Sequence, residues 1–273
     1  MFEYKRRKNI FTSALSILEL IYHVTARSVR KTHNNALFSL FMAMLQTIVL
    51  AGVFYVMFSL LGVKGSAIRG DFMLYILSGI FLFLTHTKAM GAVAGSEGPA
   101  SAMMLHAPMS TAVSICSSAL SILYIQLLSA ALVLFLYHVA VTPVYVFKPV
   151  AAVGCFLLAW FSGVAVGMIF LALKPWFPGF VSIGTQIYQR ANMLASGKMF
   201  VANSLPSFVL PMFTWNPLFH SIDQARGYTF LNYNPHHTSV SYTVYLSLTL
   251  IMIGLMGEFY TRKNASASWG ARS

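Results

Sequence analysis

Residues 36–60 read ALFSLFMAMLQTIVLAGVFYVMFSL, twenty-five positions without a charged side chain. A helix rises about 1.5 Å per residue, so this stretch is long enough to cross the roughly 30 Å hydrocarbon core of a membrane. It lacks the alternation of polar and apolar residues that is typical of a membrane β-strand. The stretch therefore predicts a membrane-spanning helix.

Five further apolar runs follow, at residues 71–92, 112–139, 150–173, 180–201 and 240–259. Gly, Ser and Ala recur in them, as suits close helix packing in lipid. We expect an all-α integral membrane protein with six transmembrane helices in residues 36–260. A cytoplasmic segment, 1–35, precedes this domain, and a cytoplasmic tail, 261–273, follows it.

The composition agrees with this class. Hydrophobic residues make up 58% of the 273 positions and charged residues only 9%. Soluble domains carry about 25% charged residues, so this chain has too little charge to cover a water-facing surface. That excludes a soluble globular enzyme, a disordered protein and a nucleic-acid-binding domain. The net charge of +12 indicates basic loops at an anionic membrane face.

Charge also predicts the orientation of the spans. An even number of spans puts both termini on one side, and residues 1–35 alone carry seven Lys and Arg. With both termini inside, twelve Lys and Arg lie on the inner side and five on the outer side. Because positive residues concentrate in cytoplasmic loops, we expect cytoplasmic termini and a multi-pass protein of the bacterial inner (plasma) membrane.

Residues 10–31 differ from the spans. Apolar side chains recur there at helical spacing, at Ile10, Ala14, Ile17, Ile21 and Val24. The charged side chains fall largely elsewhere on the helix. This pattern predicts an amphipathic helix in the inner membrane interface. The alternative is a basic topology signal with no further role.

The inner loop, residues 95–110, contains two prolines that bracket Ala100–Ala107, a length that fits two helical turns. In a lone subunit its tip would expose three apolar side chains, Met103, Met104 and Leu105. Exposed Met and Leu at a loop tip are typical of a docking surface. An equally open alternative is that this short helix packs against the inner ends of the protein's own spans.

The outer segment, residues 202–239, is long for a loop and holds four prolines with aromatic residues between them. We expect two short re-entrant helices there, at Leu205–Phe213 and Pro217–Gly227. Asn216 supplies an N-cap for the second, Pro217 a first-turn proline and Gly227 a stop.

The chain has no Gly-x-x-x-x-Gly-Lys-Ser/Thr loop to cradle a nucleotide phosphate, so ATP must be used by a partner. A hydrolase could in principle use a catalytic group made of His220, Ser221 and Asp223. However, adjacent helix positions do not face each other, so a hydrogen-bonded structural role is favoured over catalysis. We predict no cofactor, no metal site and no catalytic residue. The expected protein is not an enzyme.

Residues 180–201 are the most polar of the six runs. Ser182, Thr185, Gln189, Asn192 and Ser196 recur every three or four residues, flanked by Gln186 and Arg190. A stripe of this kind faces protein or water rather than lipid. Interhelical hydrogen bonding is one interpretation. We favour a water-lined conduit, because two Gln and one Arg exceed what packing needs.

Arg190 lies about 15 Å into this run, near the middle of the hydrocarbon core. A charge there costs roughly 3 kcal/mol or more on insertion scales, and no acidic residue is predicted at that depth. We expect Arg190 to face the conduit and contact an anionic substrate. The alternative is an arginine that binds backbone carbonyls between subunits.

Residues 215–233 read WNPLFHSIDQARGYTFLNY. Together with the six spans, the basic amphipathic helix and the proline-bracketed loop, this stretch resembles the membrane subunit (permease) of ABC-2-type transporters. The likeness is greatest to those that export capsular polysaccharide. Its most specific feature is Asn-Pro-Leu-x-His, with an Arg six residues after the His.

The resemblance implies a homodimer working with two copies of a separate ABC ATPase subunit on a lipid-linked anionic polysaccharide among membrane lipids. Periplasmic co-polymerase and outer-membrane export proteins are further implied partners. Residues 10–31 would be the interface helix and 202–235 the gate helices. The coupling helix on the ATPase would lie in 95–110, with Glu97, Met103, Met104, Leu105 and His106.

Aromatic side chains stack on sugar rings, so the candidates for the conduit wall are Phe54, Tyr55, Tyr188 and Tyr228. Alternatives within the class are export of O-antigen, teichoic acid or a small lipophilic compound. A membrane-embedded glycan or lipid transferase is a more distant alternative, because no two acidic residues form an obvious pair within the membrane.

Overall fold

The computed structural model describes residues 10–31, 35–60, 62, 68, 70–98 and 110–264, and within them it contains helices and no strand. The helices are α1 (Ile10–Lys31), α2 (Ala36–Leu60), α3 (Phe72–Ala94), α5 (Thr111–Ala140), α6 (Pro149–Leu173), α7 (Pro178–Ala195), α8 (Pro217–Thr229) and α9 (Val240–Asn264). Two 3-10 turns, η1 (Ala202–Ser204) and η2 (Leu210–Met212), precede α8.

Five of these helices, α2, α3, α5, α6 and α9, are long and apolar enough to cross a membrane. This finding confirms an all-α, multi-pass membrane protein, and all five helices begin within one residue of the corresponding predicted spans. The fifth predicted span corresponds to α7, which has 18 residues and is too polar to be counted with the others.

Helix α3 forms the centre of the bundle. Nearly all of its side chains are buried, and its closest neighbour is α6. A Cβ on Gly163 would lie 2.4 Å from the His86 carbonyl oxygen, and one on Gly167 would lie 2.7 Å from that of Met90. Small residues on α6 therefore let the two backbones approach closely, as is common between helices in lipid.

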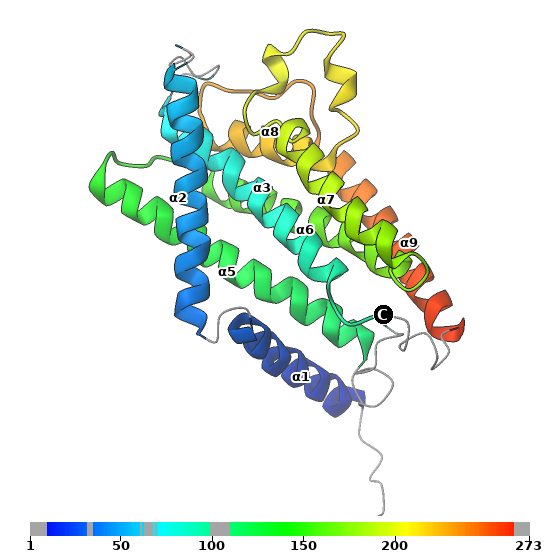
Figure 1. The fold of residues 1–273 in the computed structure, drawn as a ribbon. Helices are drawn as coiled ribbons and strands as arrows, with labels where there is room; N and C mark the ends of the chain where they lie inside the picture. The colour runs from blue at the N-terminus through cyan, green and yellow to red at the C-terminus, as the bar shows by residue number, and fades with distance from the viewer. Residues whose placement is uncertain are drawn as a thin grey trace, which may run out of the picture.

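Helix α1 lies across one end of the bundle, beside α5 (Figure 1). The Ser117 hydroxyl on α5 donates to the Ile21 carbonyl of α1 at 3.3 Å. Val29 is buried, whereas Leu15 and Leu18 are exposed. A helix forms at residues 10–31, as predicted, while its position in the membrane interface stays a prediction. The last turn of α9 lies at the same end of the bundle.

Helix α8 lies at the opposite end (Figure 1), packed against α3, α6 and α9. The Asn216 side chain caps it and Pro217 occupies its first turn, as predicted. Gly227 is not its stop, because α8 continues to Thr229. That glycine makes room for the following loop instead, since a Cβ there would lie 2.6 Å from Pro235.

The predicted helix at Leu205–Phe213 does not form. Only the 3-10 turn η2 appears there, closed by bonds such as Met212 N–H to the Val209 carbonyl at 3.0 Å. Pro211 lies inside the predicted helix, where it lacks the N–H for an α-helical hydrogen bond and its ring would clash with the carbonyl of Ser207.

Candidate functional site

Helix α7 is shorter than the predicted span 180–201. It ends at Ala195, and Gly197 then adopts a φ of +73°, in the left-handed region where a side chain is strained. A Cβ on Gly197 would also lie 2.6 Å from the Phe219 ring of α8. The predicted end at residue 201 is therefore wrong, because the chain turns at Gly197 to pack against α8.

One side of α7 faces the bundle and carries most of the polar stripe. Thr185, Gln189, Asn192 and Ser196 are buried or half-buried, whereas Ser182 is exposed. The prediction that the stripe faces protein or water, rather than lipid, agrees with these positions.

Two sets of polar contacts join α7 to its neighbours. The Tyr188 hydroxyl lies 2.9 Å from Nε2 of His86 on α3, and Nδ1 of the same ring lies 2.9 Å from the Ser162 hydroxyl on α6. At the other end, the Asn216 amide donates to Oδ1 of Asn192 at 2.9 Å. Tyr188 and Asn192, both assigned to the conduit from sequence, thus point into the bundle.

The remaining flank of α7 is exposed. It presents Gln186 and Arg190, four residues apart and therefore on one helix face. Ile183 and Ile187 are exposed beside them. The conduit residues predicted on this helix are thus divided into an inward pair, Tyr188 and Asn192, an outward pair, Gln186 and Arg190, and Gln189 between them.

A cavity of about 330 Å³ lies between α7 and the end of α3. Its lining residues are Gly91, Ala94, Gly95, Lys174, Pro178, Val181, Ser182, Thr185 and Gln189. Three members of the polar stripe therefore share one cavity with a lysine. Such a wall offers hydroxyl, amide and ammonium groups to a hydrophilic ligand.

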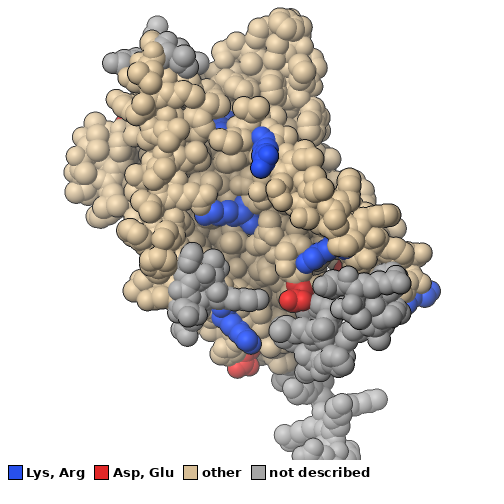
Figure 2. Space-filling model, viewed as in Figure 1, with Lys and Arg blue, Asp and Glu red and all other residues tan. Residues whose placement is uncertain are grey.

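Basic side chains are spaced over the same face of the molecule, along α3 and α7 (Figure 2). The basic residues of these helices and of the turn between α6 and α7 are Lys88, Arg190 and Lys174. Among the described residues the one ion pair joins Glu19 and His23 on α1, so none of these three cations has a carboxylate partner there. Figure 2 also shows acidic side chains toward the lower end of this view, but the three cations are not paired with them and can attract an anion.

Lys198 is a fourth cation, and it is only 3% exposed. Its Nζ lies 3.7 Å from the centre of the Phe83 ring and 5.0 Å from that of Phe54. No hydrogen-bond partner reaches this ammonium group within the described part of the chain. The two rings stabilise it through cation–π contacts, and one of them belongs to Phe54, a residue predicted for the conduit wall.

Arg226 on α8 is fully buried and has a different environment. Its guanidinium donates to the carbonyls of Gly197 and Phe200 at 2.7 and 2.6 Å and to that of Lys198 at 2.5 Å. It also lies 4.1 Å from the centre of the Tyr75 ring on α3. Arg226 thus fixes the segment after α7 onto the bundle.

Asp223, one helical turn earlier, is also buried and satisfied. Its carboxylate accepts from the Ala202 N–H at 3.1 Å, the Tyr233 hydroxyl at 2.5 Å and the Thr238 hydroxyl at 2.8 Å. Burial and the neighbouring Asp223 charge raise the pKa of the Tyr233 hydroxyl. This carboxylate joins the segments on both sides of α8.

His220 on α8 also bonds to chain segments on both sides of the helix. Its Nδ1 accepts from the Ser239 N–H at 2.9 Å, so Nε2 carries the proton and donates to the Thr214 carbonyl at 2.7 Å. Burial lowers the pKa of His220, against the opposing effects of Thr214 and Asp223. Asn216, His220, Asp223 and Arg226 share one face of α8. We call them the α8 clamp, because each bonds to chain outside α8.

The other aromatic conduit candidates lie apart. Tyr55 on α2 is 47% exposed, with its ring centre 6.1 Å from that of Phe72. Tyr228 on α8 is half-buried, and its carbonyl accepts from the Lys148 N–H at 2.8 Å. Neither residue lines the cavity beside α7.

Of the predicted coupling residues, Met103, Met104, Leu105 and His106 lie outside the described residues. Glu97 is half-buried, and its N–H donates to the Ser114 hydroxyl on α5 at 3.2 Å. From the sequence, Lys88, Lys174 and Lys198 entered only the count of Lys and Arg on the two sides of the membrane, and no site role was predicted for them. Their position in or beside apolar runs was the available signal that they matter locally.

In comparisons with known proteins, the chain matches no protein-family model and no curated protein.

Proposed function

We propose that this chain is the membrane subunit of an ATP-driven exporter in a bacterial inner membrane. Its cargo would be an anionic, lipid-linked polysaccharide of the capsular type. In this proposal α7 is the fifth of six spans, both termini are cytoplasmic, and two copies of the chain work with two copies of a separate ATPase.

One observation carries the proposal: the exposed flank of α7 presents Arg190 and Gln186 one helical turn apart, beside the exposed apolar side chains of Ile183 and Ile187. A charge at membrane depth is costly unless water, an anion or a partner neutralises it. An acidic polymer passing along this flank supplies that neutralisation. The cations Lys88 and Lys174 extend the same positive surface toward the end of the bundle where α1 lies.

Helix α7 is packed loosely enough to move as one wall of the conduit. Its contacts with α3 and α6 are few beside those that join α3 to α6. The Tyr188–His86 hydrogen bond is its one polar side-chain contact with α3 among the described residues. Energy from ATP hydrolysis would reach the bundle through residues 95–110, which Glu97 joins to α5. Movement of α7 would then advance the glycan.

The direct test is deletion of the gene, followed by fractionation of the host's acidic glycans. Loss of the exporter should leave glycan synthesis intact and trap the lipid-linked polymer inside the cell, and the restored gene should return it to the surface. Unchanged surface glycan, with no polymer retained inside, would refute the proposal.

A further inference from the structure

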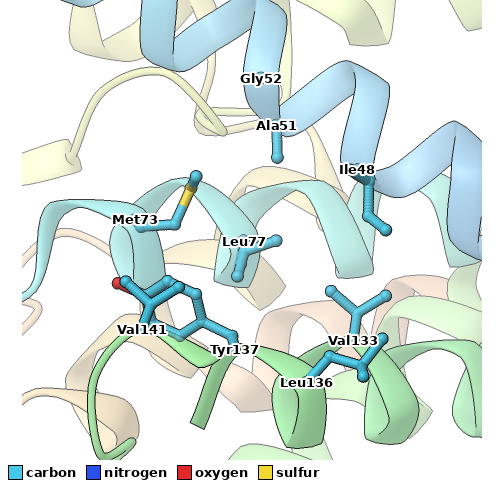
Figure 3. A pocket seen from close by; sticks show the side chains of 9 residues that line it. All are labelled: Ile48, Ala51, Gly52, Met73, Leu77, Val133, Leu136, Tyr137 and Val141. Atoms are coloured by element: carbon cyan, nitrogen blue, oxygen red, sulfur yellow. The ribbon is translucent and has the colours of Figure 1, made fainter. Parts of the chain in front are cut away.

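Two apolar crevices open between the membrane-spanning helices at the end of the bundle where α8 lies. The first measures about 310 Å³, lies among α3, α5, α6 and α8, and is lined among others by Leu127, Ala131, Val153 and Phe156. The second measures about 290 Å³ and lies among α2, α3 and α5 (Figure 3). Both are about as large as the smallest typical ligand sites, roughly 300 Å³.

The first crevice runs inward from the outer surface of the bundle. Val153 at its mouth is 49% exposed, while Phe156 and Leu82 at its base are 6% and 4% exposed. Leu157 and Tyr124 are exposed on the same two helices, α5 and α6. The mouth therefore opens on an apolar surface of spanning helices, where the solvent is lipid rather than water.

A basic residue lies beside the rim of this crevice. Val146 and Pro149 line the crevice, and exposed Lys148 lies between them in the chain, with its Nζ 5.2 Å from the centre of the Phe147 ring. Helix α6 begins at Pro149 without a side-chain cap, so the positive end of its backbone dipole lies at the same rim. The nearby loop is bonded to α8 through the Lys148 N–H and the Tyr228 carbonyl, which holds this rim in place.

The second crevice has a negative charge, that of Asp71, beside its rim. Tyr137 lines it and donates to the Asp71 carboxylate at 2.7 Å, and Thr142 donates to the same carboxylate at 3.0 Å. Burial alone would raise the pKa of Asp71, but these bonds and those from the Met73 and Leu74 N–H groups hold it below its usual value. A negative rim repels an anionic headgroup, so the two crevices differ in the lipid they accept.

We propose that the crevice among α3, α5, α6 and α8 binds one anionic phospholipid of the surrounding membrane. An acyl chain fills the crevice, and the headgroup phosphate lies against Lys148 and the start of α6. A helix of a second copy is about 10 Å wide, too wide for this space. The proposal is independent of what the protein exports.

Native mass spectrometry of the full chain, purified in a neutral detergent with phosphatidylglycerol or phosphatidylcholine added, tests this site. One phosphatidylglycerol should be retained, with roughly fivefold weaker retention of phosphatidylcholine, because one basic residue near an anionic lipid has about that effect. Lys148→Glu should remove this preference, and Val153→Trp should block the crevice and abolish retention.

Gly52→Leu is the matched control. Gly52 lines the second crevice, and a Cβ there meets nothing within 4 Å, so this change fills the crevice with the negative rim and should leave phosphatidylglycerol retention unchanged. If Val153→Trp impairs folding, Ala131→Leu narrows the same crevice more mildly.

Equal retention of both lipids, or retention unaffected by Lys148→Glu and the filling variants, would overturn the proposal. So would a shift from dimer to monomer on filling the crevice, since a second copy of the chain would then be its occupant.

Discussion

Helices α7 and α8 follow one another in the chain, and each carries one arginine on a helix rich in polar residues. On α8, Arg226 is fully buried and donates to three carbonyls. On α7, Arg190 is exposed and has no carboxylate partner among the described residues. The same residue type thus serves structure in one helix and remains available to a ligand in the other.

The difference shows how polar residues in a membrane protein are to be interpreted. The stretch Asn216–Arg226 is the most distinctive motif of the sequence, but its polar side chains are used to hold the chain together. Arg190 belongs to no motif, and no carboxylate among the described residues pairs with it. A functional role is therefore assigned more safely from missing partners than from a distinctive motif.

The largest expected effect comes from Arg226→Gln. This change leaves buried carbonyls at Gly197, Lys198 and Phe200 without their donors, and each such group costs about 1–3 kcal/mol. We expect a loss of about 3–5 kcal/mol and little folded protein in the membrane, measured by size-exclusion chromatography after heating.

Arg190→Gln is the matched control, with the same substitution on an exposed flank. Its stability should stay within about 0.5 kcal/mol of the wild type. Equal destabilisation by the two substitutions would mean that Arg190 also has a structural partner, and the contrast between the helices would fail.

Asp223→Asn should have the next largest effect. The carboxylate accepts three hydrogen bonds, from Ala202, Tyr233 and Thr238. In the Asn variant an NH2 group replaces one oxygen, and because it is itself a donor it cannot accept these bonds. We expect a loss of about 1–3 kcal/mol, visible as a lower Tm. Tyr233→Phe removes one donor only and should cost less; the reverse order would contradict the described bonding.

Acid should weaken the α8 clamp through His220. Because burial lowers the pKa of His220 in the folded protein, the neutral ring is favoured there. Its stabilising effect is present above the ordinary pKa of about 6.5 and is lost as the pH falls below it. The Tm difference between wild type and His220→Gln should shrink between about pH 7.5 and pH 5.5. A constant difference would argue against this role.

Tyr188→Phe should have the smallest effect on stability. It removes the hydroxyl contact with His86, and interhelical hydrogen bonds in membranes contribute about 0.6 kcal/mol on average. The packing of the ring against Phe170 is kept. Faster proteolysis of the loops beside α7, with Tm nearly unchanged, would fit a loosely held helix. A large drop in Tm would instead show that α7 is fixed to α3.

Much of the fold follows from the sequence, because a long apolar helix is nearly the only way to satisfy its backbone in lipid. The polar regions are harder to predict. The neighbouring residues in the sequence do not show that Gly227 lies inside a helix and leaves room for Pro235. They also do not show that Arg226 binds the non-helical segment that follows Ala195. The first outcome depends on a loop that folds back eight residues later, and the second on hydrogen bonds between residues 26 to 29 positions apart.

The candidate site was predicted only in part for a related reason. Helical periodicity identifies which residues share a face, and the inward position of Thr185, Gln189 and Asn192 agrees with it. Periodicity does not show which neighbour a face meets. Tyr188 therefore could not be assigned to His86, nor Lys198 to the rings of Phe54 and Phe83.

The most direct test of the account is the amount of surface glycan on cells whose only copy of the chain carries Arg190→Gln, normalised to the inserted protein. We expect normal insertion and assembly, a clear fall in surface glycan with polymer trapped inside, and a milder defect for Arg190→Lys. Normal surface glycan with Arg190→Gln would contradict the account, and so would loss of the folded complex itself.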